Sequence, residues 1–304
     1  MKFYPKNHKY IHEGISYPSA SAIIEAYFGK FRKYDVADKY AKKHNIRKSK
    51  VLKDWADKAK KATTIGTLIH EYAETQVSGE NHEYMAKTTR EKEIIQDNKD
   101  KIEELKKKTD SVIKKIKKKF PDYEYTTEMI IYSEKLKLAG TADLVLKKEE
   151  KVVILDYKTS KEISQTPFAA WSPRSYTHPV CFPNSNFFKY SVQTGIYGLL
   201  YKTTQDQDYI FKYKNTDFET VHIPPYLSFG NVYYNKPYPF PLSDEFFIVY
   251  IPTERIIPCI KIPEELILKI IMIGNPFSKL IKKVPTWYFA KYKNDIKITK
   301  RVTL

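Results

Sequence analysis

The sequence predicts an α/β protein in which a mixed β-sheet is flanked by helices. Helical periodicity dominates the first 120 residues, and after Pro121 the hydrophobic period changes to that of β-strands. Later segments continue the order helices, sheet, helix, sheet, helix. A chain of 304 residues is long enough to bury a substantial core in one large domain or two small ones.

The N-terminal region is predicted to be mostly helical. A short helix is expected over residues 19–28, with Ser19 as its cap and Gly29 as its stop. Helical spacing continues over residues 39–61, and a further helix is expected from Thr64 to the Ser78-Gly79 pair. Residues 90–120 place apolar side chains on one helix face and lysines on the other, and Pro121 ends this pattern.

The remaining chain alternates between strand and helix. Three antiparallel strands are expected first, and a helix follows them. Two further strands and a helix with proline in its first turn come last. In chain order, these elements are expected at residues 126–133, 136–146, 152–158, 186–201, 245–251, 259–262 and 263–273.

Two segments, residues 163–185 and 203–243, fit neither period and are predicted to be functional inserts or small subdomains. We expect one domain over residues 1–304. Its parts are a mostly helical region (1–120), a sheet with the following helix (121–202), a Tyr- and Pro-rich insert (203–243), and C-terminal strands with a helix (244–304). The aromatic rings of the insert predict either base stacking or, as the favoured alternative, anchoring of the insert itself.

Charge and composition limit the function classes. Lys and Arg outnumber Asp and Glu by 53 to 36, and the net charge of +17 favours a polyanionic partner, although AT-rich coding is an alternative source of lysine. A hydrophobic content of 42% excludes a disordered polycation. Cys181 and Cys259 match no disulfide framework or zinc site, and neither a signal core nor a membrane span is visible. We therefore expect a soluble intracellular protein.

The segment 138–159 carries the residues that indicate chemistry. It predicts a β-hairpin with Glu149 and Glu150 at the tip, a register that places Asp143 opposite Asp156 with Cβ atoms about 5 Å apart. Two such carboxylates in apolar strands repel unless a cation lies between them, and oxygen ligands favour Mg²⁺, with Mn²⁺ as the alternative. Lys158 shares the face of Asp156, where it would orient an attacking water or stabilise developing charge on a phosphodiester.

This prediction depends on the register, because a shift of one residue would move Asp143 to the other face of its strand. A surface hairpin with an Asp–Lys salt bridge is the alternative interpretation of the same residues.

Gly140-x-x-Asp143 followed by Asp156-Tyr157-Lys158-Thr159 resembles the PD-(D/E)XK nuclease superfamily, in its RecB-nuclease-like and lambda-exonuclease-like branch. Within that branch the chain is similar to stand-alone exonucleases of phages and large DNA viruses. Ala142 stands where the name of the superfamily has proline, as is common in this branch.

Three flanking features follow the same order as in this branch. Gly66-Thr67-x-x-His70-x-x-x-Glu74 resembles its helix motif, Glu128 resembles the acid on the preceding strand, and Gln193-x-x-x-Tyr197 resembles its Q-x-x-x-Y motif. Taken singly, each has an ordinary alternative: a surface histidine, an exposed acid and a half-buried core tyrosine. Their joint occurrence in the right order is the stronger argument.

The resemblance implies a restriction-endonuclease-like core and a Mg²⁺-dependent deoxyribonuclease in which Asp143, Asp156, Lys158 and Glu128 are catalytic. The metal ligands that it implies are His70, Glu128, Asp143, Asp156 and the backbone carbonyl of Tyr157. The residues expected to bind DNA or to position the site are Gln193, Tyr197, Thr159, Lys114, Lys115 and Lys118. The three lysines belong to residues 101–119, whose net charge of +6 predicts either a phosphate-tracking ridge or a solvated helix face.

An exonuclease acting at DNA ends in replication, recombination or repair is the favoured function, because the resemblance is to end-processing enzymes. A structure-selective endonuclease and a catalytically silent DNA-binding factor are the alternatives, and RNA remains open as a substrate. The expected partner is single- or double-stranded DNA, with no membrane, and with a second copy or a recombination or replication protein as further partners. The expected location is the cytoplasm of a bacterial or virus-infected host cell.

Overall fold

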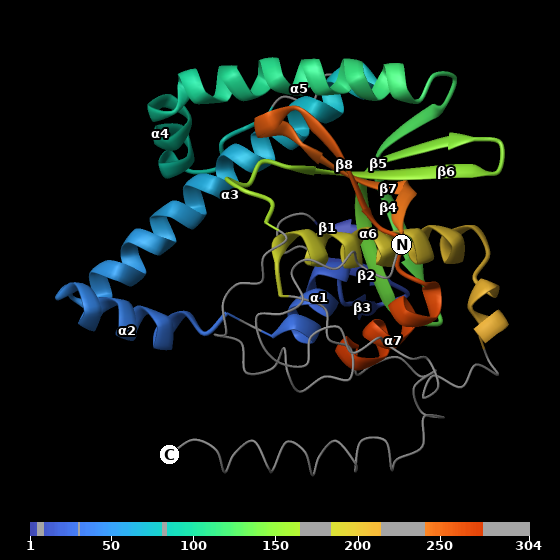
Figure 1. Cartoon of the computed structure of the whole chain (residues 1–304), viewed down its shortest axis with the longest axis horizontal. Helices are drawn as coiled ribbons and strands as arrows, with labels where there is room; N and C mark the ends of the chain where they lie inside the picture. Colours follow the sequence, from blue (N-terminus) through green and yellow to red (C-terminus); the bar gives the residue numbers. More distant parts are fainter. Residues whose placement is uncertain (5–8, 30, 81–83, 165–183, 214–240, 276–304) are drawn as a thin grey trace, which may run out of the picture.

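A five-stranded mixed sheet forms the centre of the computed structural model, which describes residues 1–4, 9–29, 31–80, 84–164, 184–213 and 241–275 (Figure 1). The strands, in spatial order, are β4 (Glu124–Ser133), β5 (Leu138–Lys148), β6 (Lys151–Lys158), β7 (Leu242–Tyr250) and β8 (Arg255–Ile260). All neighbours are antiparallel except β6 and β7, which are parallel. The predicted mixed sheet is therefore confirmed, and the helix α6 (Asn186–Gln205) lies on the crossover that a parallel pair requires.

Helices cover both faces of this sheet (Figure 1). One layer comprises α3 (Lys48–Ser78), α4 (Thr89–Asp97) and α5 (Lys99–Lys119), and the other comprises α1 (Ala20–Phe28), α6 and α7 (Glu264–Gly274). Each layer packs its own cluster of buried apolar side chains against the sheet, with Leu144 and Leu155 on the first side and Val145 and Ile154 on the second. The alternation of neighbouring strand residues between two cores is what a sheet buried on both faces requires.

The helix boundaries differ from the prediction at two places. Residues on either side of Thr64 form one 31-residue helix, α3, because the buried Ile65, Leu68 and Ile69 hold it against the sheet and outweigh the weak breaking tendency of threonine. The break before α3 lies instead at Asn45, which caps α2 (Lys33–His44) with a left-handed φ of 50°.

The predicted helix over 90–120 is divided at Asn98 into α4 and α5. The side-chain amide of Asn98 donates a hydrogen bond to the Ile94 carbonyl at 2.7 Å, a local bond that satisfies a carbonyl at the end of α4. The short helix α1 agrees with its prediction, since Ser19 accepts a hydrogen bond from the amide of Ala22 and Gly29 follows with a φ of 83°.

A small antiparallel sheet precedes the helices and was not predicted. Its strands, β1 (Lys2–Tyr4), β2 (Lys9–His12) and β3 (Ile15–Tyr17), are each too short to show a period. The amide of Ala139 in β5 donates a hydrogen bond to the Pro18 carbonyl at 3.1 Å, which joins this sheet to the large one. The connection brings β2 toward the middle of β5.

Most of the two predicted inserts, including Cys181 and the aromatic residues 226–240, lies outside the described residues. Cys259 is buried in the core. Within the described ranges, every helix is too short or too polar to cross a lipid bilayer. The division of the chain into one domain over residues 1–304 stays a prediction.

Candidate active site

The sheet forks where β5 and β6 stop pairing. The hairpin has the predicted register, with pairs from Lys148 and Lys151 at the tip to Leu144 and Leu155. Beyond that pair, β5 continues along β4 and β6 continues along β7. The next row across the fork holds Asp143 and Asp156, so both carboxylates sit where the backbone of the sheet separates.

Where the backbone hydrogen bonds between β5 and β6 end, a side chain of β5 accepts a hydrogen bond from the backbone of β6. The amide of Tyr157 donates a hydrogen bond to Oδ2 of Asp143 at 2.7 Å. Tyr157 therefore reaches the site through its amide, while its carbonyl as a metal ligand stays a prediction. Because the amide holds one carboxylate oxygen, Asp143 is fixed in orientation before any ligand binds.

Glu128 lies in the same row on β4 and has an unusual backbone. The β4–β5 pairs have one register on both sides of Glu128, but the pair of Glu128 with Asp143 is missing. Glu128 has a φ of 46°, which costs a non-glycine residue about 1–3 kcal/mol and is concentrated at functional sites. Side chains before and after this row face opposite layers: Tyr125 packs with α3–α5, whereas Met129 packs with α1, α6 and α7.

Three side chains from separate elements converge at this row. His70 on α3, Glu128 on β4 and Asp143 on β5 each place one ligand atom within 4.8 Å of the others. Nδ1 of His70 lies 3.5 Å from Oδ2 of Asp143. Burial of its carboxyl, together with repulsion from Asp143, Glu74 and Asp156, raises the pKa of Glu128 to about 8, although the residue as a whole is exposed.

Such crowding of acids is unfavourable without a cation, and two carboxylates with one imidazole suit a divalent metal ion. The residues present therefore fit the metal that the sequence predicts.

Asp156 and Lys158 form a second, buried part of the site. Asp156 is 2% exposed, and its Oδ2 atom forms an ion pair with Nζ of Lys158. Burial raises the pKa of Asp156, with a further increase from Asp143 and opposition from Lys158. Burial lowers the pKa of Lys158, but the Asp156 and Asp143 carboxylates raise it more, so its net pKa lies above the ordinary value.

The fork thus gives the two opposed aspartates different surroundings. The candidate metal site of His70, Glu128 and Asp143 does not include Asp156, which forms an ion pair with Lys158. Both aspartates were predicted as metal ligands on one face of the hairpin. Asp143 instead contacts His70 on α3 and the amide of Tyr157, beside the left-handed backbone of Glu128, and a hairpin register alone does not contain these contacts. Asp156 as a metal ligand stays a prediction.

The helix α6 approaches the fork from the other layer. The side-chain amide of Gln193 donates a hydrogen bond to the Tyr197 hydroxyl at 2.8 Å. The ring of Tyr197 lies directly over Gly140, where an added Cβ atom would stand 2.8 Å from Cε1. Burial and the charges of Asp156 and Asp143 raise the pKa of Tyr197 well above its ordinary value. The Q-x-x-x-Y pair is therefore a hydrogen-bonded unit whose buried member, Tyr197, packs against the strand that carries Asp143.

On the α3 side, a Cβ atom at Gly66 would stand 3.2 Å from Oγ1 of Thr159. Gly66 thus lets α3 approach the end of β6, which places His70 over the fork. The predicted positioning residue Thr159 touches this helix.

Two tyrosines near the site were not among the predicted site residues. The hydroxyl of Tyr10 lies 2.9 Å from Oγ1 of Thr141, and burial, with the charges of Glu128 and Asp143, raises the pKa of Tyr10. The ammonium of Lys158 lies 4.8 Å from the ring centre of Tyr190. Tyr190 precedes Gln193 by three residues and Tyr197 by seven, so helical spacing contained a signal for it. Tyr10 belongs to the small N-terminal sheet, and its sequence context contained no signal for a place at the site.

The predicted phosphate-binding lysines lie on α5, the outer helix of its layer (Figure 1). Lys114 and Lys118 are exposed. Lys115 is already engaged, since its ammonium lies 3.4 Å from Oε2 of Glu254 and donates a hydrogen bond to the Glu254 carbonyl at 3.0 Å. The three lysines do not join the fork, and their role in binding DNA stays a prediction.

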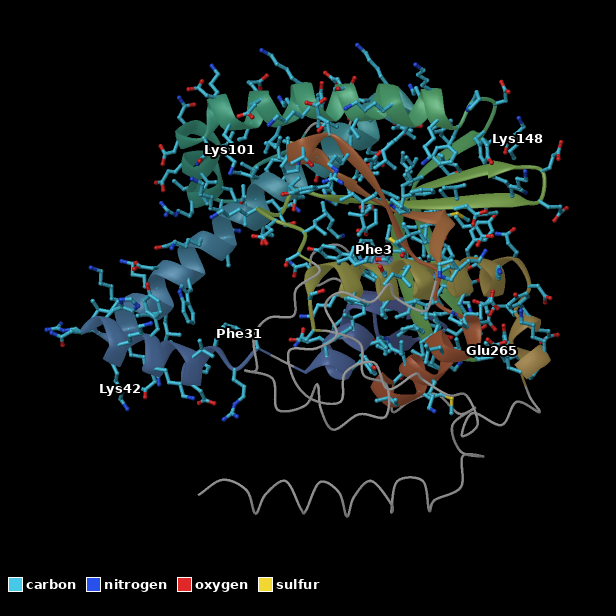
Figure 2. All side chains as sticks on the ribbon, viewed as in Figure 1. Phe3, Phe31, Lys42, Lys101, Lys148 and Glu265 are labelled. Carbon is cyan, nitrogen blue, oxygen red and sulfur yellow. The ribbon has the colours of Figure 1, made fainter. Side chains whose placement is uncertain are left out.

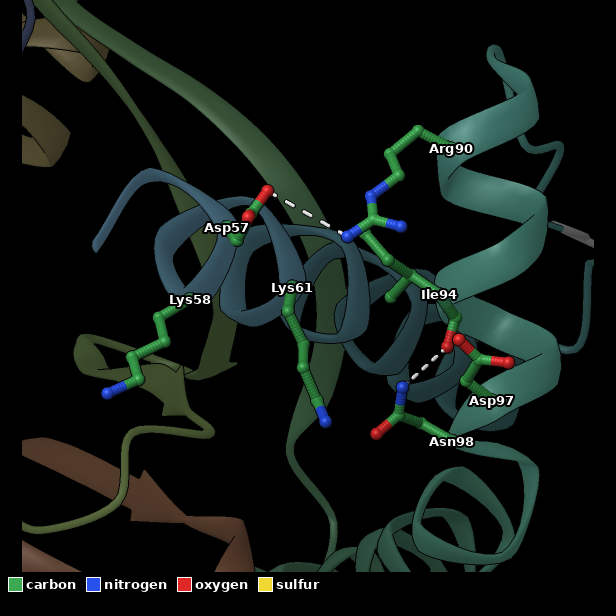
Figure 3. Close-up of a pocket in the computed structure, with 7 residues that line it drawn as sticks. All are labelled: Asp57, Lys58, Lys61, Arg90, Ile94, Asp97 and Asn98. Carbon is green, nitrogen blue, oxygen red and sulfur yellow. Dashed lines mark hydrogen bonds and ion pairs between the residues drawn. The ribbon is translucent and has the colours of Figure 1, made fainter. Parts of the chain in front are cut away.

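A shallow hollow of about 280 Å³ lies between α3 and α4, apart from the fork (Figure 3). It is lined by Asp57, Lys58, Lys61, Arg90, Ile94, Asp97 and Asn98. Arg90 and Asp57 stand 3.8 Å apart across it. None of the residues at the fork lines this hollow, so the hollow is separate from the candidate active site.

Fold and fork together define an α/β protein of the nuclease type, with acids, a histidine and a lysine gathered where two strands separate. The profile of the PD-(D/E)XK nuclease superfamily matches residues 40–222, more than half of the chain, and the chain belongs to this superfamily. The matched range contains every predicted site residue. No curated protein matches the chain. Membership implies a nucleic-acid substrate, cleavage of phosphodiester bonds, and the divalent metal that such nucleases typically bind.

Proposed function

We propose that the chain is a Mg²⁺-dependent deoxyribonuclease that hydrolyses DNA from its ends, in the RecB-nuclease-like and lambda-exonuclease-like branch of the superfamily. The observation that carries the proposal is the convergence of His70, Glu128 and Asp143 beside the Asp156–Lys158 pair. A surface salt bridge on a hairpin would involve neither a histidine from α3 nor a strained glutamate from β4.

In this proposal His70, Glu128 and Asp143 hold the ion, and the buried carboxylate of Asp156 completes the negative surroundings. A bound Mg²⁺ or Mn²⁺ neutralises phosphate charge and lowers the pKa of water. Lys158 remains an ammonium because two carboxylates lie near it, so it acts as a hydrogen-bond donor and stabilises charge on the phosphate. Gln193 and Tyr197 fix the strand that carries Asp143.

Action at ends is favoured over internal cleavage by the resemblance of the motif set to end-processing enzymes. The sequence order of Gly140-x-x-Asp143, Asp156-Tyr157-Lys158-Thr159 and Gln193-x-x-x-Tyr197 supports this choice. A role in replication, recombination or repair follows from the same resemblance and belongs to the proposal, as does DNA rather than RNA.

The test is a cleavage assay on linear single-stranded DNA, linear double-stranded DNA and covalently closed circles, each with Mg²⁺, with Mn²⁺ and with EDTA. Linear substrates carry a label at either end, so the order of label release gives the polarity. A matching RNA substrate is included. The variants Asp143→Asn and Lys158→Ala serve as catalytic controls, and Glu124→Gln on β4 is the matched surface control.

Metal-dependent loss of linear DNA with circles intact supports the proposal. Cleavage of circles would replace it with the endonuclease function, and cleavage of RNA alone would replace the substrate. Binding without cleavage in either metal would leave a catalytically silent DNA-binding factor. Full activity of both catalytic variants would remove the fork from the mechanism.

A further inference from the structure

The helix α2 and the first half of α3 form a hairpin of helices that projects from the body of the protein (Figures 1 and 2). We call residues 31–62 the arm. The arm has a small core of its own, in which Ala37, Ala41 and Val51 pack with Leu52 and Trp55. This core holds α2 against α3, so the outer surface of the arm is a fixed surface rather than a loop.

A strip of aromatic rings runs over this arm. Neighbouring ring centres are 5.9 Å apart from Phe31 to Trp55, 6.2 Å from Trp55 to Tyr40, and 4.2 Å from Tyr40 to His44. Phe31 is 68% exposed and Tyr40 is 45% exposed. Large rings gathered in the open, and not merely scattered, mark a surface that binds something. We call Phe31, Trp55, Tyr40 and His44 the aromatic strip.

The charge around the aromatic strip indicates a polyanion. The arm contains twelve Lys and Arg residues and four Asp residues, so it holds +8 of the net charge of +17. The helix α5 is also basic but contains no aromatic residue. Phosphate contacts alone explain a surface like α5, whereas rings beside cations are the combination that binds unpaired bases.

The arm leads to the fork through a single helix. Trp55 and His70 are 15 residues apart on α3. At 1.5 Å and about 100° per residue, their positions differ by about 22 Å along the axis and by about 60° around it. Lys58 and Lys61 lie between them along the axis but on another side of α3, where they line the hollow beside α4 (Figure 3). Trp55 of the aromatic strip and His70 of the candidate metal site therefore lie toward the same side of α3.

We propose that the arm binds single-stranded DNA, with bases stacked on the aromatic strip and phosphates on its lysines, and delivers that strand to the fork. The inference rests on the proposed function for what happens at the fork and adds the substrate class. A stacked strand advances about 3.4 Å per nucleotide, so about six nucleotides span the distance from Trp55 to His70. An unpaired tail of at least that length is the substrate that uses both surfaces.

The test separates binding from cleavage. Fluorescence anisotropy in EDTA measures the affinity of the full-length protein for an oligothymidylate of about 20 nucleotides, for one of about 4, and for a blunt duplex. The test variant is Phe31→Leu with Tyr40→Leu, which keeps apolar character and removes the flat rings. Phe31→Tyr keeps the ring. The matched control is Phe211→Leu, because Phe211 is 44% exposed and also has a lysine, Lys135, over its ring.

The double variant is expected to bind the long oligothymidylate about 10- to 100-fold more weakly, whereas Phe31→Tyr and Phe211→Leu bind as the wild type does. Affinity for the short oligonucleotide and for the duplex changes less than about threefold. Unchanged affinity for the long strand overturns the inference, as does equal weakening for the strand and the duplex. Circular dichroism establishes that the exposed substitutions leave the helices folded. The variant Lys58→Gln with Lys61→Gln is an independent test of the phosphate contacts, and it is expected to reduce the salt dependence of binding.

Cleavage is measured on the same proteins with Mg²⁺. If the double variant loses affinity but the wild type never cleaves, the arm stands and the proposed nuclease function fails. If the wild type cleaves and the double variant binds normally, the nuclease function stands and the arm fails.

Discussion

Replacing Glu128 with glutamine is expected to stabilise the protein when metal is removed, although it removes a proposed ligand. The carboxyl of Glu128 has a pKa of about 8, against 4.5 for an ordinary glutamate. Between pH 4.5 and 8 the folded state therefore holds a proton that the unfolded chain releases. Under this condition the free energy of unfolding falls as the pH rises.

The size of the effect follows from the same shift. At about pH 7.5 the three pH units above 4.5 correspond to at most about 4 kcal/mol, at about 1.36 kcal/mol per unit. Glu128 is an exposed residue, so solvent screening reduces this to about 1–2 kcal/mol. For 304 residues that is a rise of about 2–3 °C in Tm for Glu128→Gln.

The assay is thermal unfolding of wild type, Glu128→Gln and Glu124→Gln, in EDTA and in Mg²⁺, from pH 4.5 to pH 8. In EDTA the advantage of Glu128→Gln grows with pH and vanishes near pH 4.5, while Glu124→Gln follows the wild type. In Mg²⁺ the wild type gains stability by binding the ion, and the variant gains less. A variant that is less stable than the wild type in EDTA at high pH would refute the repulsive acid group.

Three further predictions concern packing, pH and binding. Gly140→Ala drives a methyl group into the Tyr197 ring and is expected to cost about 1–3 kcal/mol in urea unfolding and to reduce cleavage; normal stability and activity would contradict the packing. Glu264 forms ion pairs with Lys202 and Lys212 that, despite burial, lower its pKa to about 2. Its contribution is therefore present above about pH 4.5 and is lost as the pH falls toward 2, so Glu264→Gln is less stable than wild type by about 1–3 kcal/mol near neutrality and equal to it in acid, which pH-dependent denaturation checks. Replacing three exposed α5 lysines with glutamine is expected to reduce the slope of log affinity against log salt by about 2, and an unchanged slope would make α5 a solvated face. These lysines are Lys114, Lys117 and Lys118.

Local pattern was sufficient for much of the fold. The tip at Glu149 and Glu150 fixed the hairpin register, and with it the row shared by Asp143 and Asp156. Ser19 and Gly29 marked both ends of α1. In each case the signal is a capping or turn residue next to a clear period, and such local preferences agree with the tertiary fold.

The parts that sequence did not contain depend on contacts between distant segments. The left-handed φ of 46° at Glu128 and the approach of His70 to Asp143 involve separate elements of the fold, so neither has a local signal. Continuity of α3 past Thr64 depends on burial against the sheet. The short strand with Tyr10 acquires its place only through the bridge from Pro18 to Ala139.

Because α3 is unbroken, the distance and the rotation between the arm and the fork are both set by the number of residues between them. Inserting a single residue between Trp55 and His70 would advance the arm by about 1.5 Å and rotate it by about 100° relative to the fork. An insertion of seven residues would almost restore the phase while moving the arm outward by about 10 Å. The number of residues between Trp55 and His70 therefore sets the spacing of the two surfaces. A related chain that keeps the same relative rotation can change this number only by nearly whole helical turns.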